Sequence, residues 1–177
     1  MATLHHNISG ELTKEILAPG DTKNVSSISF ANVNTFKHVL VDFFMQKSET
    51  GKFYLFKNVK IPAGTSYMYD ASINNRVNQF GLYVKLKAAD TFTLTAVNPG
   101  DNSQGIDPAA NTSVTGVGTL FTKELTIGDS IIVSGETRIV ESITNDTTLT
   151  VTSAFSNNSL DNTPDCTPTA LLDVIIT

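Results

Sequence analysis

The sequence predicts an all-β protein, and three observations support that prediction. Apolar residues occupy every second position in short segments, for example Phe80, Leu82, Val84 and Leu86 in the segment 78–87, and this is the period of a half-buried strand. Such segments follow one another about every ten residues. Turn-forming Gly, Pro, Asn and Ser residues separate them. The pattern favours an antiparallel β-sandwich of the jelly-roll or immunoglobulin-like type.

The first part of the chain contains most of the predicted strands. In the segment 38–47 both faces are apolar, with Val41 and Phe43 on one side and Leu40 and Phe44 on the other. We therefore expect this strand to be covered on both sides. Further strands are expected at 26–33, 52–61, 65–70, 78–87 and 90–97.

Two polar segments, 98–113 and 156–169, flank a second β-rich stretch at 114–155. A structureless loop of that length is unusual inside a compact domain, so we interpret both segments as linkers around an inserted module. An insertion is tolerated where its two ends lie close together. The predicted domains are a discontinuous host β-sandwich at 1–98 plus 169–177 and an inserted small β-barrel module at 99–168, with its core at 113–156.

The apolar segment 170–177 is the last predicted strand, and it stands alone after the second linker. A single strand cannot satisfy its own backbone hydrogen bonds. We expect it to cross back and close the sheet of the host domain. The alternative is that it caps the inserted module. We favour the host domain, because the module already has enough strands of its own for a small barrel.

Charge and composition exclude several classes of protein. Residues 99–168 hold nine acidic and two basic side chains, a net charge of −7, whereas the remainder holds eight acidic and ten basic, a net charge of +2. The overall charge of −5 argues against nucleic acid as a partner. The sequence shows no signal-peptide pattern and no apolar run that could span a membrane.

We identify no catalytic residue, no cofactor site and no metal site in the sequence. His5 and His6 are expected in a solvated N-terminal tail, and Cys166 as an exposed spare thiol in the second linker. As the one cysteine, it excludes an intrachain disulfide. Asp129 follows a glycine before a strand, so its carboxylate is expected to bind nearby backbone amides. Segment 101–112 has Thr112 where a calcium loop requires Glu.

Aromatic residues cluster on consecutive predicted strands. They could line a ligand site, for example for a sugar, but we favour core packing together with a protein interface. The N-terminal residues 1–17 are expected to be extended, because Ala-Pro-Gly follows them, and to order by packing on a neighbouring chain. Alternatively, residues 12–17 form the first strand of the host domain and only 1–9 are loose. The candidate interface residues are Leu4, Ile8, Phe44, Tyr54, Tyr67 and Tyr69.

Several segments resemble known structural proteins of viruses. The stretch "FYLFKNVKIPAGTSYMYD" (53–70) resembles small β-sandwich virion proteins of tailed bacteriophages, including marine ones, and "MATLHHNISGELTKEIL", "QFGLYVKLKA" and "LLDVIIT" fit the same kind of protein. Residues 114–155, with "TGVGTLF" and "LTIGDSIIVSGETRIVESI", resemble a small SH3-like barrel module of phage structural and tail-associated proteins. The shared motifs are structural, and the resemblance assigns no functional residues.

The resemblance implies a non-enzymatic structural component of a tailed-phage virion: a capsid decoration, neck or tail-associated protein, assembled in the host cytoplasm. The expected partners are copies of itself, as a trimer or larger homo-oligomer, and virion proteins such as the major capsid or neck and tail proteins. Neither nucleic acid nor membrane is expected as a partner, and no cofactor. The alternative is a receptor- or glycan-binding adhesion module of a phage tail or fibre, with the acidic inserted module as the reader.

Overall fold

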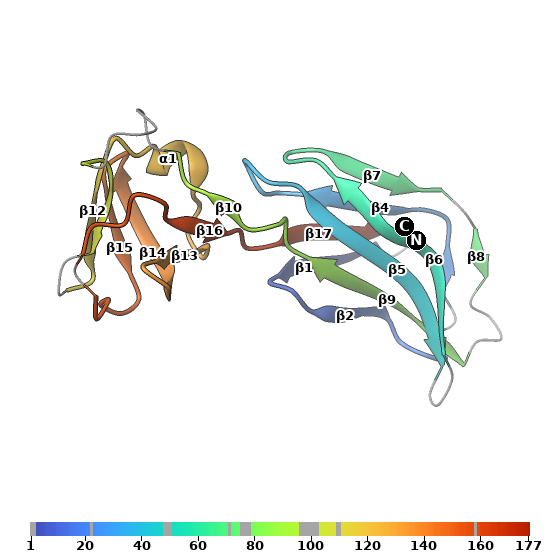
Figure 1. Ribbon diagram of the computed structural model, residues 1–177. Coiled ribbons are helices and arrows are strands. Elements are labelled where there is room, and N and C mark those ends of the chain that lie inside the picture. Colours follow the sequence, from blue (N-terminus) through green and yellow to red (C-terminus); the bar gives the residue numbers. More distant parts are fainter. Residues whose placement is uncertain are drawn as a thin grey trace. The chain divides into compact units, whose positions relative to one another are not determined.

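The structure is a computed structural model that describes residues 3–21, 23–47, 51–70, 72–74, 79–95, 103–108, 111–157 and 159–177. It is all-β with antiparallel sheets, and its described residues form no closed barrel. The chain divides into unit 1, Met1–Ala89 with Ala170–Thr177, and unit 2, Asp90–Thr169 (Figure 1). The boundaries thus fall at Ala89 and Ala170, whereas the sequence predicts them at 98 and 169.

Unit 1 contains two four-stranded sheets and a two-stranded ribbon. Sheet A has the order β1 (Leu4–Ser9), β17 (Leu171–Ile176), β4 (Ile28–Asn32) and β7 (Ser66–Tyr69). Sheet B has the order β2 (Thr13–Leu17), β9 (Phe80–Lys87), β5 (Val39–Lys47) and β6 (Lys52–Ile61). The ribbon pairs β3 (Asn24–Val25) with β8 (Ile73–Asn74).

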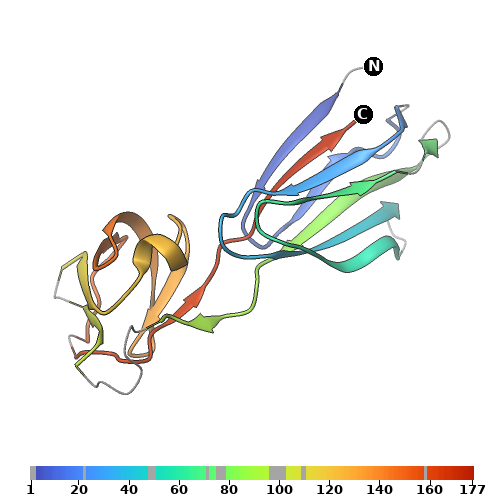
Figure 2. The same cartoon turned by 90° about the horizontal axis from the view of Figure 1, so that it is seen from above.

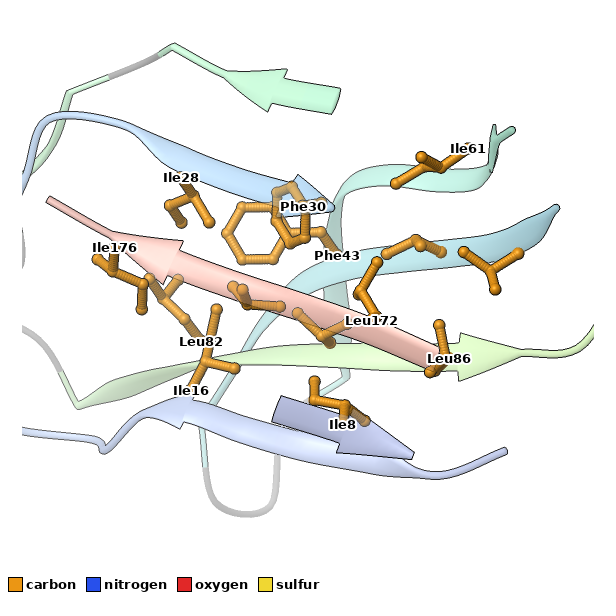
Figure 3. Close-up of a cluster of buried hydrophobic side chains, with 14 of the residues drawn as sticks. Ile8, Ile16, Ile28, Phe30, Phe43, Ile61, Leu82, Leu86, Leu172 and Ile176 are labelled. Carbon is orange, nitrogen blue, oxygen red and sulfur yellow. The ribbon is translucent and has the colours of Figure 1, made fainter. Parts of the chain in front are cut away.

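The two sheets contribute to one core. Alternation along each strand directs one row of apolar side chains inward, and Figure 3 shows rows from sheet A and sheet B facing each other. Phe30 of sheet A meets Phe43 and Phe56 of sheet B, with ring centroids 5.4 and 5.3 Å apart. Burial of this apolar surface, at about 25 cal/mol per Å², is the main stabilising contribution to unit 1.

The last strand, β17, lies in the interior of sheet A, between β1 and β4 (Figure 2). The chain leaves unit 1 after β9 and returns into β17 beside the turn between β1 and β2. Gly10 N–H donates to the Ala170 carbonyl oxygen at 2.8 Å, and Ala88 N–H donates to the Glu11 carboxylate at 2.8 Å. Gly10 has a φ of +87°, a conformation that glycine adopts at little cost.

The N-terminal segment is extended, and strands of its own chain hold it in place. β1 pairs with β17 from Leu4–Ile176 to Ser9–Leu171, and β2 pairs with β9. Ile8 and Ile16 are 3% and 2% exposed. The favoured expectation of an arm ordered on another chain is therefore wrong. Backbone hydrogen bonds to sheet A and sheet B supply the stabilisation that the few apolar side chains of this segment cannot provide.

Unit 2 is built around one open sheet, which we call sheet C. Its order is β10 (Phe92–Thr93), β16 (Asp165–Thr167), β13 (Ser130–Val133), β14 (Glu136–Asn145), β15 (Thr148–Val151), β12 (Ser113–Val117) and β11 (Gly105–Pro108). A single helical turn, α1 (Phe121–Glu124), precedes β13. A second core, separate from that of unit 1, includes Phe121, Ile131 and Leu149.

Three expectations for the boundary segments are corrected. Phe92–Thr93, expected as a host strand, pairs with Cys166 and Asp165 in sheet C. Each predicted linker contains a strand, β11 in the first and β16 in the second. These strands escape detection because they are short and polar, so their pairing depends on partners distant in sequence. Positions 98–102 and 109–110 of the first linker lie outside the described residues.

Glu136, at the start of β14, anchors a loop of unit 2. Its carboxylate accepts from Ser156 N–H (3.1 Å), Ser156 Oγ (2.8 Å) and Asn157 N–H (2.8 Å). Arg138 Nη2 lies 2.6 Å away. These bonds, the Ser156 backbone bond foremost, lower the pKa of Glu136 to about 2, because each favours the ionised carboxylate.

Truncation of Leu172 should destabilise unit 1 much more than truncation of its neighbour. Leu172 is fully buried in the core, whereas Leu171 is partly exposed on the opposite face of β17. We expect Leu172→Ala to cost about 2–5 kcal/mol and Leu171→Ala no more than about 1 kcal/mol. Urea unfolding followed by tyrosine fluorescence measures this, since all four tyrosines lie in unit 1. Equal losses would contradict the placement of β17.

The contribution of Glu136 to stability should depend on pH. Because its folded pKa is lowered from 4.5 to about 2, its stabilising effect is present above about pH 4.5 and is lost as the pH falls toward 2. We expect Glu136→Gln to lower the protection of unit 2 amides in hydrogen exchange at neutral pH, and the difference from wild type to shrink below pH 4.5. Glu141→Gln, at an exposed position of β14, is the matched control. A pH-independent difference would contradict this assignment.

Candidate interaction surface

The described residues contain no group of three or more His, Cys, Asp or Glu side chains placed to hold a metal ion. Within the same residues, no helix is both long and apolar enough to cross a membrane. His5 and His6 belong to β1 instead of a loose tail. His6 Nε2 lies 2.9 Å from the Ile16 carbonyl oxygen, so this ring bridges β1 to β2.

Cys166 is buried, which corrects the expectation of an exposed thiol. It lies in β16 at 0% exposure and belongs to the core of unit 2. Its Sγ is 4.0 Å from the Asp129 carboxylate. Asp129 itself accepts from Thr126 N–H (2.9 Å) and Thr169 N–H (2.7 Å), which confirms the interpretation of this residue as a turn anchor. Both side chains therefore have structural roles.

The six predicted interface residues do not form one surface. Ile8 and Phe44 are buried within the chain itself, at 3% and 0% exposure. Leu4 and Tyr69 are partly buried and pack against the core of unit 1. Tyr54 and Tyr67 are exposed at 42% and 38%, on β6 and β7 respectively.

An aromatic row runs across the outer face of sheet B, the face directed away from the core. Phe44 pairs with Tyr54 of β6 and with Tyr83 of β9 in the strand register. The Phe44 ring stacks on Tyr83 with centroids 5.6 Å apart and planes at 14°, and it meets Tyr54 at 5.4 Å. Among the described residues, Phe44 is thus covered by its strand neighbours Tyr54 and Tyr83.

Charged groups surround this aromatic row. Lys52 Nζ lies 4.6 Å from the centre of the Phe44 ring, and Lys57 Nζ lies 5.0 Å from that of Tyr54. Both distances suit cation–π attraction. The Tyr83 hydroxyl donates to Glu15 at 2.7 Å, and this hydrogen bond, aided by desolvation, raises the pKa of Tyr83.

Two bulges in β6 give the face its shape. The register shifts between Val41 and Phe43 and again between Phe43 and Phe44. At the first shift, Asn58 has a φ of +54°, and its N–H donates to the buried Asp42 carboxylate at 2.7 Å. Lys87 forms a 3.0 Å salt bridge with that carboxylate. Bulges re-aim side chains, and here they direct Phe56 into the core and Tyr54 outward.

Sequence reasoning missed Tyr83, Lys52 and Lys57 as members of this surface. A signal for Tyr83 was available: it alternates with the buried Leu82 and Val84 and therefore belongs to the opposite face of β9. No comparable signal marks the two lysines, because the bulges interrupt the alternation of β6.

The comparisons with protein-family models, curated proteins and solved structures found no match for this chain.

Phe44 should behave as a core residue although it faces outward. We expect Phe44→Ala to cost about 3–5 kcal/mol, because it removes a fully buried ring that contacts Tyr54 and Tyr83. Phe53→Ala, at a 56% exposed position of β6, is the matched control and should cost about 1 kcal/mol or less. Urea unfolding of the two variants tests this. A large loss only for Phe53→Ala would contradict the arrangement.

Proposed function

We propose that this chain is a non-enzymatic structural component of a tailed-phage virion, working through protein–protein contacts as a capsid decoration, neck or tail-associated protein. The observation that carries the proposal is the outer face of sheet B, where aromatic rings and lysines lie together on an exposed strand surface. Aromatic residues are enriched where protein surfaces bind each other. The resemblance of residues 53–70 to small phage virion proteins names the class of assembly.

For the fold, we propose a β-sandwich for unit 1 and a small SH3-like β-barrel for unit 2. Two four-stranded sheets that share one core support the first. A bridge between Ile106 of β11 and Asp161 supports the second. The N–H groups of these two residues donate to each other's carbonyls at 2.8 and 2.9 Å. Asp161 shortly precedes β16, so the bridge brings opposite ends of sheet C toward each other.

A second candidate function is a receptor- or glycan-binding adhesion module, in which unit 2 binds the receptor or glycan. The observation in its favour is a set of exposed apolar side chains in unit 2, namely Val117, Ile127, Ile139 and Leu160. Selective binding on a glycan array, lost when Asp90–Thr169 is replaced by a short Gly-Ser linker, would favour this candidate over a purely architectural role.

The structural role predicts that the chain is part of the assembled particle. Mass spectrometry of tailed particles from the virus that encodes it should detect the chain at copy numbers comparable to those of other structural proteins. It should sediment with intact particles through a density gradient and remain after a high-salt wash. Host proteins depleted by the same wash serve as the control. Absence of the chain from several independent particle preparations would reject the proposal.

A further inference from the structure

We propose that the outer face of sheet B binds an acidic, apolar face of unit 2 from a second copy of the chain. The proposal rests on the structural role above and names one of its partners. We call the two surfaces the lysine face and the acidic face, and each belongs to a single unit. The contact is heterologous, because the two surfaces that meet are different.

The lysine face carries an excess of positive charge. Lysines project from it on β6 and β9, and two carboxylates among its described residues are engaged: Asp42 with Lys87 and Glu15 with Tyr83. Tyr54, 42% exposed, supplies aromatic surface beside Lys57. The basic residues of this face are Lys52, Lys57, Lys60, Lys85 and Lys87.

The acidic face follows from the alternation in sheet C. Ile131 is buried, so its neighbour Ile132 is directed outward, opposite Asp165 of β16. Ile139 of β14 is 47% exposed, and Glu141, at the bulge that follows Val140, is also exposed. Ile127 lies close by, because the N–H of the next residue, Gly128, donates to the Val140 carbonyl at 2.9 Å. At 66%, Ile127 is strongly exposed for an apolar residue.

The charges of the two units are opposite, and this selects a second copy as the occupant. Unit 1 has ten basic and seven acidic side chains, a net charge of +3, and unit 2 has two basic and ten acidic, a net charge of −8. Lysine face against lysine face, or acidic face against acidic face, would place like charges together. A lysine face and an acidic face attract each other, and their contact also removes Tyr54, Ile127 and Ile139 from water.

A heterologous contact of this kind can be repeated from copy to copy. It generates a ring where the rotation closes and an open chain where it does not. Either product is suited to a repeating part of a particle. Because the contact includes exposed charges, it should weaken as salt is added.

Charge reversal in the full-length chain tests the pairing. The first variant, Lys52→Glu with Lys57→Glu, reverses the lysine face, and the second, Ile139→Lys with Glu141→Lys, reverses the acidic face. Sedimentation velocity over a range of concentrations should show wild-type association that decreases with salt. Each variant alone should associate at least about tenfold more weakly. A mixture of the two variants should regain association. In it, the unaltered acidic face of the first variant can bind the unaltered lysine face of the second.

The matched control is Lys14→Glu with Lys123→Glu, which changes the charge by the same amount as the first variant at exposed positions outside both faces. It should associate like wild type. A wild-type chain that stays monomeric at every concentration and at low salt would overturn the proposal. So would variants that weaken association without recovery on mixing, provided their circular dichroism spectra match wild type. Presence in the virion is measured separately, so failure here leaves the structural role standing.

Discussion

The pairing of the last strand with the first governs how this chain folds. β17 occupies an interior position of sheet A, between β1 and β4. In this pairing, Leu4 near the start of the chain lies opposite Ile176 near its end. Sheet A remains split until the final residues are in place. Closing so long a loop has an entropic cost that grows slowly with its length, and such non-local pairing slows folding. The cost is lowest where the intervening segment returns the chain to the place it left.

Both units are arranged to meet that requirement. In unit 1, Gly10 and Glu11 bind Ala170 and Ala88, so one turn holds the departing and the returning segment. In unit 2, β10 and β16 pair antiparallel, and Thr91 lies 2.8 Å from Thr167 between side-chain hydroxyls. Each unit has a core of its own. Insertion therefore leaves the packing of both units intact, and their surfaces can carry opposite charge.

On the outer face of sheet B, the same residues protect a sheet edge and form an aromatic, basic surface. β6 is an edge strand, and exposed edges invite unwanted pairing unless bulges or charges prevent it. The two bulges and the exposed Lys52, Lys57 and Lys60 provide both. The same bulges turn Tyr54 outward beside Phe44. Features that keep β6 from pairing freely thus also create an aromatic, basic surface.

The sequence alone determined the all-β class and the inner rows of strands such as β5 and β9, because alternation is a local property that each segment carries by itself. It also indicated the role of Asp129, since a turn carboxylate binds amides close in sequence. Only the tertiary structure decided that Ile8 and Cys166 are buried, that β11 and β16 are strands, and that Phe44 is covered by Tyr54 and Tyr83. Those outcomes depend on partners far away in the chain and on bulges that shift the register by one residue, and neither leaves a periodic trace in the sequence.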